Sequence, residues 1–187
     1  MSDQIVKGRG IRVAFPHLVE KHASKKHPNS KAKFGIQLLL HKKDNAEIIA
    51  RIDAATDVLC AEMGWTKNTV KALAYVEADS VVNDAGEALV GYDSKHLSLS
   101  AKSDNRPSVF GRDGGVLSSE EITSTVYGGC YCMVSMAIYA AKAYRKICVE
   151  LRAVVFDREG ERFGGGGAPV SDAKSEFGNF LSDEDLF

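Results

Sequence analysis

Gly129-Cys-Tyr-Cys-Met-Val-Ser-Met-Ala-Ile-Tyr139 and Ile147-Cys-Val-Glu-Leu-Arg-Ala-Val-Val-Phe156 form the strongest strand pattern of this 187-residue sequence. Apolar residues alternate through both stretches, which is typical of strands that bury one face. In the first stretch this face holds Cys132, Val134, Met136 and Ile138; in the second it holds Ile147, Val149, Leu151, Ala153 and Val155. The intervening residues 140–146 are basic and aromatic. The pattern predicts a hairpin with an exposed tip.

Three earlier segments also read as strands. Ile11–Phe15 alternates, and Pro16 should end it because proline cannot donate to a strand ladder. Residues 20–31 then read as a basic exposed loop. Lys33–Leu40 places Phe34, Ile36, Leu38 and Leu40 on one face, and in His96–Lys102 the buried residues should be Leu97, Leu99 and Ala101.

One helix is expected, over Asp44–Met63. Asp44 with Glu47 resembles a capping box, an apolar stripe runs from Ile48 to Leu59, and Gly64 follows as a stop signal. Ser118–Glu121 predicts a brief helical turn. Val70–Ala78 is compatible with a strand or a short helix, whereas residues 84–86, 103–108 and 111–115 read as turns or loops.

The fold class predicted from these elements is mainly β. Five to six strands and one inserted amphipathic helix (about 44–63) indicate a small barrel. The glycine run 164–167 divides this domain, residues 1–163, from a flexible acidic tail within residues 164–187. The sequence lacks an apolar signal core and any run of about 18 apolar residues, so neither export nor a membrane span is expected. The four cysteines do not form a dense disulfide framework, and cytosolic thiols are expected.

Charge is distributed very unevenly along the chain, although the formal net charge is only −1. Residues 1–43 carry ten basic and two acidic side chains, a balance of +8, whereas residues 168–187 carry five acids and one lysine, a balance of −4. Such asymmetry favours a polyanion site and a tail that competes for it. The tail ends with Asp183, Glu184, Asp185, Leu186 and Phe187, whose apolar side chains have no evident core to enter, so a partner or a groove of the same molecule should bind them.

Signatures of catalysis are missing from the sequence. It contains neither a phosphate-binding Gly-x-x-x-x-Gly-Lys-Ser/Thr loop nor a Gly-x-Ser-x-Gly elbow. Cys130 and Cys132 have the wrong spacing for a zinc knuckle and should lie together in the core. His22 and His27 offer only a weak metal site. We therefore expect a protein that is not an enzyme and has no metal or cofactor.

Nucleic-acid binding fits the sequence better, because single strands need cations for phosphates and flat side chains for bases. Tyr144, at the expected hairpin tip, is the best stacking candidate, whereas Phe15 and Phe34 share faces with aliphatic neighbours and are expected in the core. The predicted contacts to single-stranded DNA are Lys7, Arg9, Arg12, Lys33, Lys95, His96, Lys102, Arg106, Arg112, Tyr139, Lys142, Tyr144 and Arg145.

The sequence resembles a family of bacteriophage single-stranded-DNA-binding proteins over nearly its whole length. The likeness rests on residues 12–16, 33–40 and 103–107, on Val126-Tyr-Gly-Gly-Cys-Tyr131 and on the closing acidic-aromatic tail. The resemblance implies an oligonucleotide/oligosaccharide-binding (OB) barrel and a non-catalytic role in replication, recombination and repair. It also implies a setting in the cytoplasm of the infected bacterial host.

The hypothesis is thus sequence-independent binding of single-stranded DNA, with a tail that competes for the DNA groove and recruits a polymerase, helicase-primase or nuclease. A homodimer is a further expectation, since a tail can then reach a second subunit. Three alternatives stay open at this point: RNA binding, a viral structural or assembly β-barrel protein, and a small nuclease that holds Mg²⁺ with Asp and Glu.

Overall fold

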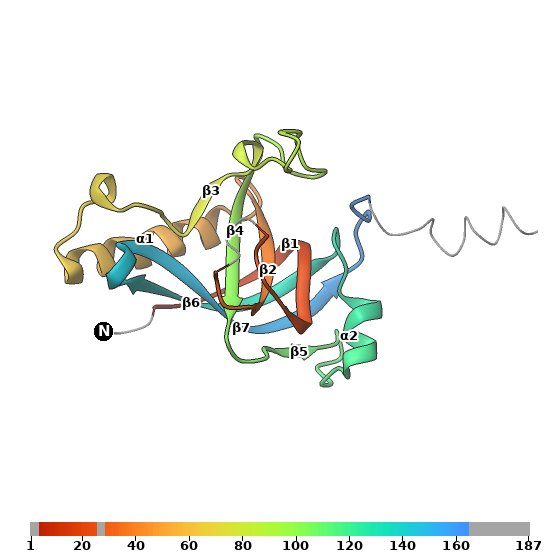
Figure 1. Cartoon of the computed structure of the whole chain (residues 1–187). Helices are drawn as coiled ribbons and strands as arrows, with labels where there is room; N and C mark the ends of the chain where they lie inside the picture. Colours follow the sequence, from red (N-terminus) through yellow and green to blue (C-terminus); the bar gives the residue numbers. More distant parts are fainter. Residues whose placement is uncertain (1–3, 26–28, 165–187) are drawn as a thin grey trace, which may run out of the picture.

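The chain folds into a closed β-barrel. The structure is a computed structural model that describes residues 4–25 and 29–164. Within these residues five long strands form the wall: β1 (Gln4–His22), β2 (Lys33–His41), β4 (His96–Ser103), β6 (Tyr131–Ala141) and β7 (Lys146–Arg158) (Figure 1). Their neighbours run β4–β2–β1–β6–β7, and a parallel pairing of β7 with β4 closes the ring. This pairing leaves the five wall strands without a free edge.

Shorter elements decorate the barrel. β3 (Tyr75–Glu77) pairs with β4, and β5 (Ser108–Phe110) pairs in parallel with β7. The helices are α1 (Ala46–Met63) between β2 and β3 and α2 (Ser119–Thr125) before β6, with single 3-10 turns η1 (Lys67–Thr69), η2 (Ala78–Ser80) and η3 (Lys142–Tyr144). Residues 70–78, for which the sequence was compatible with a strand or a short helix, thus contain a short strand. Strand β5 was not predicted.

The interior of the barrel holds the faces that alternation predicted. Cys132, Val134, Met136 and Ile138 on β6 are buried, as are Leu97, Leu99 and Ala101 on β4. On β2 the buried face comprises Ile36, Leu38 and Leu40. Each of these side chains joins the main hydrophobic cluster, whose removal from water is the dominant favourable term in folding.

The alternation predicted for β7 is wrong beyond Leu151. Ser135 pairs with Ala153 but Met136 pairs with Leu151, so Arg152 is an extra residue in the ladder. Such a bulge exchanges the two faces of the strand from that point on. Val154 is therefore fully buried, whereas the predicted core residues Ala153 and Val155 are only partly buried.

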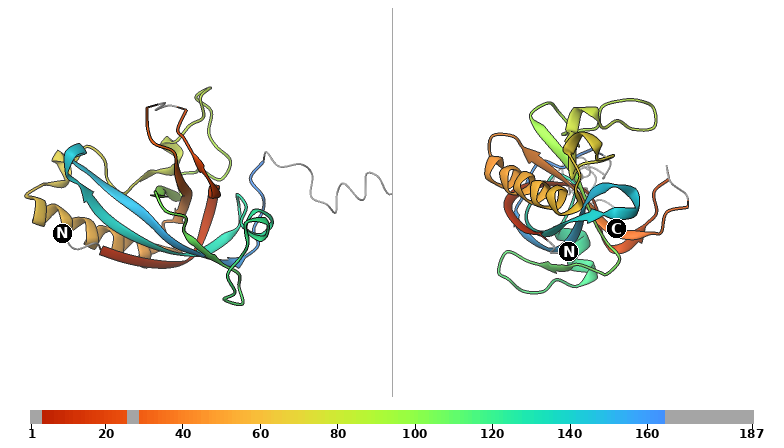
Figure 2. Two further views of the ribbon diagram at one scale, coloured as in Figure 1. Left: turned by 60° about the horizontal axis from the view of Figure 1, so that its bottom comes forward. Right: turned by 90° about the vertical axis from the view of Figure 1, so that its left-hand side faces the viewer.

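The predicted end of the first strand at Pro16 is also wrong, because β1 continues to His22. Its register with β2 shifts between Ala14 and His17, so Pro16 occupies an irregular stretch where no regular ladder bond is needed. In the same stretch Phe15 adopts a φ of +46°, and its side chain is 52% exposed rather than in the core. The extended ends of β1 and β2 project from the barrel as an arm (Figure 2). Phe34, at the start of β2 in this arm, is half-buried.

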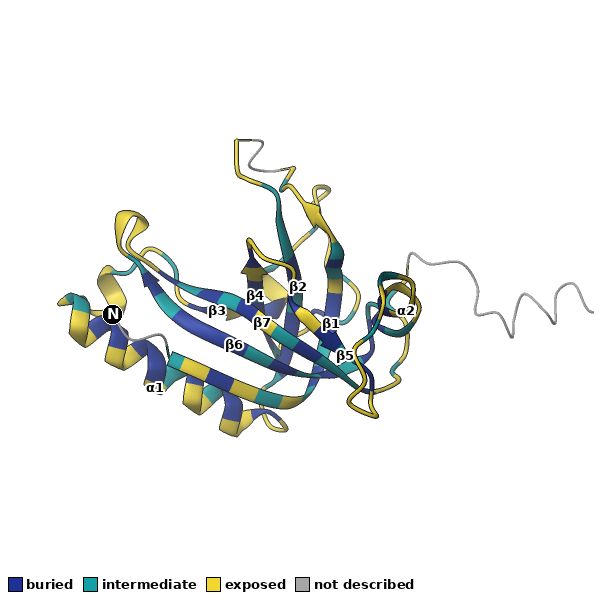
Figure 3. Cartoon of the chain, turned by 90° about the horizontal axis from the view of Figure 1, so that it is seen from below, coloured by how far each residue is buried: buried dark blue, intermediate teal, exposed yellow. Residues whose placement is uncertain are grey.

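Helix α1 packs one face against β1 and β6, and Figure 3 shows buried and exposed residues alternating along it. Ile48, Ile52, Ala55 and Leu59 are buried, and Gly64 ends the helix in the left-handed conformation, both as predicted. The predicted Asp44–Glu47 capping box is absent from this described helix end. Helix α2, by contrast, does begin with a capping box, in which Ser118 and Glu121 bond reciprocally.

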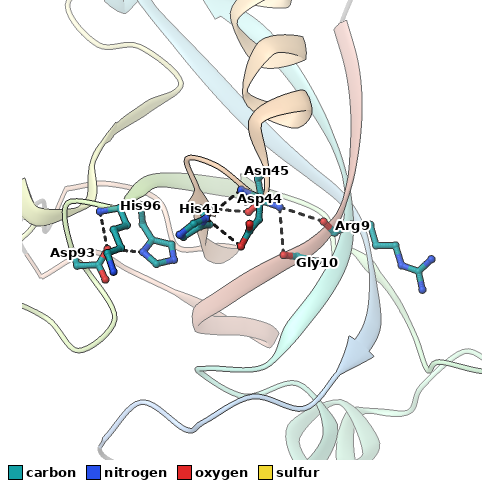
Figure 4. Close-up of polar contacts among 8 residues, drawn as sticks. Arg9, Gly10, His41, Asp44, Asn45, Asp93 and His96 are labelled. Carbon is teal, nitrogen blue, oxygen red and sulfur yellow. Dashed lines mark hydrogen bonds and ion pairs between the residues drawn. The ribbon is translucent and has the colours of Figure 1, made fainter.

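Asn45 occupies the N-cap position of α1, but its side chain forms hydrogen bonds outside the helix. Its Oδ1 accepts from the His41 backbone N–H at 2.8 Å, and its Nδ2 donates to the carbonyls of Arg9 and Gly10 at 3.4 Å each (Figure 4). Asp44 instead pairs with the His41 ring at 3.2 Å. The start of α1 is thus fastened to the β1 bulge by a side chain, which overrides the local capping pattern.

Candidate nucleic-acid interface

An open groove runs over the outer face of β2 and β4 and has a volume of about 340 Å³. We call it the aromatic groove, because three aromatic side chains, Phe15, Tyr75 and Tyr92, border it. Strand β3 and the segment after η2 form its outer wall, and they rise beside β4 in Figure 1. The lining residues are Phe15, Gln37, Leu73, Ala74, Tyr75, Val76, Val81, Leu89, Tyr92, Ser98 and Ser100.

Phe15 owes its position in the groove to an uncommon backbone conformation. A positive φ is unfavourable for a residue with a bulky side chain and tends to occur at functional sites. Here it turns the ring out of the β1 ladder, 6.4 Å from the Tyr92 ring. The result is a half-exposed aromatic face beside a buried one, an arrangement on which a flat base can stack.

The two tyrosines of the groove are neutral at physiological pH. Burial raises the pKa of Tyr75 to about 12, and its hydroxyl donates to Asp53 at 2.7 Å. Burial likewise raises the pKa of Tyr92 to about 12. Both rings are neutral at physiological pH, as a tyrosine with an ordinary pKa of about 10 also is, so neither repels a phosphate chain.

The floor of the groove is polar. Gln37 donates to the Ser100 hydroxyl at 2.9 Å across β2 and β4. One step further along, Gly35 pairs with Lys102, so no side chain rises from β2 there. The Lys102 side chain lies over this glycine instead, because its Cγ is 3.4 Å from the position that a Cβ of Gly35 would take.

A second hollow of about 220 Å³ continues the same face beyond Lys102, and we call it the lysine pocket. It is lined by Lys33, Lys102, Ser103, Asp104, Tyr139 and Glu150. Asp104 lies 3.3 Å from the amines of both Lys31 and Lys33, and these two lysines lower the pKa of its carboxyl. Burial raises the pKa of Tyr139 to about 12. Predicted residues Lys33, Lys102 and Tyr139 thus meet in one place.

The β6–β7 tip carries three further predicted residues, Lys142, Tyr144 and Arg145. Tyr144 is 68% exposed, and the Arg145 guanidinium lies 5.9 Å from the Trp65 ring centroid. Backbone bonds from Lys71 to Arg145 and from Ile147 to Ala72, 2.9 Å each, join the tip to the segment that enters the groove wall at Leu73. The tip therefore lies at the edge of the aromatic groove.

The other predicted contacts lie away from this face. Lys7, Arg9 and Arg12 are on β1 where it borders β6, and Figure 4 shows the Arg9 side chain pointing away from α1. His96 pairs with Asp93 at 2.6 Å and meets the His41 ring edge-on, next to Lys95. Arg106 donates to Ser119, and Arg112 lies on the turn after β5. Asp183, Glu184, Asp185, Leu186 and Phe187 lie outside the described residues.

Sequence reasoning missed most of the groove wall. Tyr75 and Tyr92 come from a region without clear periodicity, and Phe15 was assigned to the core because it alternates with Ile11 and Val13. Only the proline after Phe15 hinted at an irregular strand. In the described part of the chain, no group of three His, Cys, Asp or Glu residues is placed to hold a metal ion. Across the same residues, no helix combines the length and the apolarity that crossing a bilayer requires.

The strand order and the parallel closure of β4 on β7 define an OB-type barrel, here with α1 inserted between its second and third strands. In this class the face of the second and third strands, with the loops that flank it, binds oligonucleotides and oligosaccharides. Those two strands are β2 and β4, and the flanking loops are the β1–β2 arm and the β6–β7 tip. The aromatic groove occupies this face, and the lysine pocket adjoins it where β4 pairs with β7.

The chain belongs to the family of the Enterobacter phage Enc34 ssDNA-binding protein, whose family model matches residues 3–187. It is 28% identical over 171 residues to protein p50 of Acyrthosiphon pisum secondary endosymbiont phage 1, covering 87% of this chain and 88% of that protein. The resemblance inferred from the short motifs is thereby confirmed.

Solved structures show the same fold. The single-stranded DNA-binding protein of bacteriophage Enc34, solved in complex with ssDNA, superposes with a TM-score of 0.70 at 21% identity, covering 86% of this chain and 90% of that one. The single-stranded DNA-binding protein encoded by bacteriophage T7 gives a TM-score of 0.52 at 11% identity, covering 100% and 99%. The predicted OB-like barrel with an inserted helix is thus confirmed.

Proposed function

We propose that this protein binds single-stranded DNA without sequence preference, through the aromatic groove and the lysine pocket. The observation that carries the proposal is the continuity of the two hollows on the β2–β4 face, since Ser100 lines one and Lys102 the other. Family membership supports it. Bases stack on Phe15 and against Tyr75, while Lys33 and Lys102 receive phosphates.

The mechanism is displacement of counterions together with stacking. Each phosphate that a lysine neutralises releases condensed cations, so affinity falls with salt, with a slope of about −0.7 per contact on single strands. Stacking contributes about 1–3 kcal/mol per base and accepts every base. The groove floor offers hydroxyl groups and one amide, Gln37, whose Nε2 already donates to Ser100, so we expect only slight sequence preference.

The proposal extends to the whole chain. Residues 1–163 form the binding domain and residues 164–187 a linker and acidic tail. The tail occupies the groove when DNA is absent and, once displaced, recruits a polymerase, helicase-primase or nuclease. The protein acts without catalysis in phage replication, recombination and repair, in the cytoplasm of the infected host, and can work as a homodimer. The charge asymmetry of the sequence supports this tail mechanism.

Phe15→Ala tests the groove. Loss of one stacked base should weaken binding of a short labelled oligonucleotide by roughly 5- to 150-fold, measured by fluorescence anisotropy. Val116→Ala is the control, because Val116 is 74% exposed but lies on the hairpin after β5. Equal affinities of Phe15→Ala and wild type would remove Phe15 from the site, and a wild type that binds no oligonucleotide at low salt would refute the function itself.

Deletion of residues 178–187 tests the tail separately. If the tail competes for the groove, the truncated protein should bind single-stranded DNA more tightly, most clearly at low salt where charges are least screened. Unchanged affinity at every salt concentration would contradict competition and leave only partner recruitment.

A further inference from the structure

Two arginines and two aromatic rings form a stack on β1, β6, β7 and the segment that follows β7, away from the aromatic groove. The Arg158 guanidinium lies 4.2 Å from the Tyr131 ring centroid, and that of Arg12 lies 5.7 Å from the same ring. Arg12 also lies 4.4 Å from the Phe163 ring. We call Arg158, Tyr131, Arg12 and Phe163 the arginine–aromatic ladder. Arg9 adjoins it, because Arg9 and Arg158 share Asp157 at 3.3 and 3.5 Å.

The ladder carries excess positive charge on an accessible surface. The Arg9 and Arg158 side chains are 73% and 55% exposed, whereas Asp157 is 7% exposed and already engaged by both. The sequence around the ladder contributes five cations against three carboxylates, a balance of +2: Lys7, Arg9, Arg12, Arg158 and Arg162 against Asp157, Glu159 and Glu161. A guanidinium whose face covers a ring still directs in-plane N–H donors outward, where they fit phosphate oxygens.

Arg12 itself is held in place. It donates to the carbonyls of Gly129 at 3.3 Å and Glu161 at 3.0 Å. These bonds fix the centre of the ladder to the end of the barrel, so we assign the ligand to the more exposed Arg9 and Arg158. Because guanidinium groups already cover the rings, the ladder suits phosphates rather than bases.

The ladder begins where the aromatic groove ends. Phe163 packs against the small cluster of Ala14, Leu39, Ala78 and Tyr92 on the outside of β1 and β2. Gly91, with a φ of +82°, lies so close that a Cβ there would collide with the Phe163 ring. Tyr92 in turn lines the groove opposite Phe15. A chain that leaves the groove past Tyr92 therefore meets Phe163 and then Arg12.

We propose that the ladder is a second track for the same single-stranded DNA, which binds the phosphodiester backbone after it leaves the aromatic groove. This inference rests on the proposed function and extends its site around the barrel. It predicts a division of roles: the groove binds a short strand by itself, and the ladder adds affinity only for strands long enough to reach it.

The experiment compares two oligonucleotide lengths. A single OB groove covers as few as about 4 nucleotides and as many as about 16, so single strands of about 8 and about 30 nucleotides separate the groove from the track. The test variant is Arg9→Gln with Arg158→Gln. The charge-matched control is Arg51→Gln with Lys67→Gln, two exposed cations paired with Glu47 and Asp57 beside α1.

We expect the test variant to bind the long strand about tenfold more weakly at 0.2 M salt, with a salt slope shallower by about 1.4, as for two lost phosphate contacts. The test variant should bind the short strand with the affinity of the wild type. The control variant should have wild-type affinity for both the short and the long strand. Thermal unfolding checks folding, and Arg9→Gln alone, at a highly exposed position, repeats the test with half the slope change if the double variant is unstable.

Three results would overturn the ladder proposal while leaving the groove intact: unchanged binding of the long strand, an equal loss with both lengths, or an equal loss in the control. Unchanged binding of the long strand would mean that the DNA does not contact these arginines. An equal loss with both lengths would mean that the arginines belong to the groove site. An equal loss in the control would mean that the effect comes only from the change in net charge. A wild type that binds neither strand is a different failure, since it refutes the proposed function itself.

Discussion

The aromatic groove and the arginine–aromatic ladder use the same residue types in opposite ways. In the groove the rings of Phe15 and Tyr75 meet solvent and the nearby cations are lysines. In the ladder two guanidinium groups lie within 5.7 Å of the Tyr131 ring centroid, and the cations are arginines. A free ring can stack on a base, whereas a covered ring can only hold its arginines in place. The comparison teaches that aromatic and basic residues in a sequence indicate nucleic-acid binding, but that the sequence does not show whether a given ring contacts a base or an arginine of the same chain.

Among charge substitutions on the groove face, the largest expected effect comes from its two lysines. Lys33→Gln with Lys102→Gln should weaken binding about tenfold at 0.2 M salt and lower the salt slope by about 1.4. The loss should be the same for short and long strands, unlike that of the ladder variant. Anisotropy titrations over a salt series measure both quantities, with Arg51→Gln/Lys67→Gln as the matched control. A loss confined to the long strand would erase the distinction between the two faces.

The second prediction concerns the strained backbone that exposes Phe15. At a φ of +46° an alanine has the same difficulty as phenylalanine, whereas glycine has none. Phe15→Gly should therefore be more stable than Phe15→Ala by about 1 kcal/mol, measured by chemical denaturation. Both variants should lose the stacking contribution to DNA binding. An alanine variant as stable as the glycine variant would show that the backbone relaxes and that no strain maintains the ring in the groove.

Much of the fold was predictable because it follows from alternation. Interior residues such as Leu99 and Met136 belong to strands with one buried face, and the α1 stripe follows the helical period. The errors occur where the ladder is irregular. The bulge at Arg152 reverses the pattern of β7, and the shift after Ala14 moves Phe15 from the core to the surface. Bulges depend on pairing with a strand that is distant in the sequence, so they cannot be predicted from the local sequence.

The candidate site was less predictable for the same reason. Lys33, Lys102 and Tyr139 were foreseen as contacts from charge and exposure, but their meeting in one pocket depends on barrel closure between β4 and β7. Tyr75 and Tyr92 lie in a segment without period, and only its return to β4 places them over the sheet. Asn45 shows the converse: its side chain binds β1 instead of capping its own helix, so a local rule gave way to a tertiary contact.

A smaller effect is expected at the two acids that neighbour these cations. Asp104 is half-exposed between Lys31 and Lys33, where it would compete with phosphates in the proposed site, whereas Asp157 is buried and contacts Arg9 and Arg158. Asp104→Asn should therefore strengthen binding roughly two- to fivefold at low salt, the scale of an exposed ion pair. Asp157→Asn should instead lower the melting temperature. Parallel binding and thermal measurements on both variants check this, and weaker binding by Asp104→Asn would mean that its carboxylate orients the lysines.

The smallest effect concerns pH and the arm beside the groove. His17 and His22 stack at 4.2 Å, and burial, then the charge of His22, lower the pKa of His17 below 6.5. The unfolded chain thus binds this proton more readily, so the free energy of unfolding should fall as pH drops from about 6.5 to the lowered value, and level off below it. Melting temperatures at pH 7.5 and 5.5 measure the decrease. His17→Gln should reduce it more than His22→Gln, because the second substitution leaves the larger cause, burial, in place; equal decreases in all three proteins would show that His17 contributes nothing.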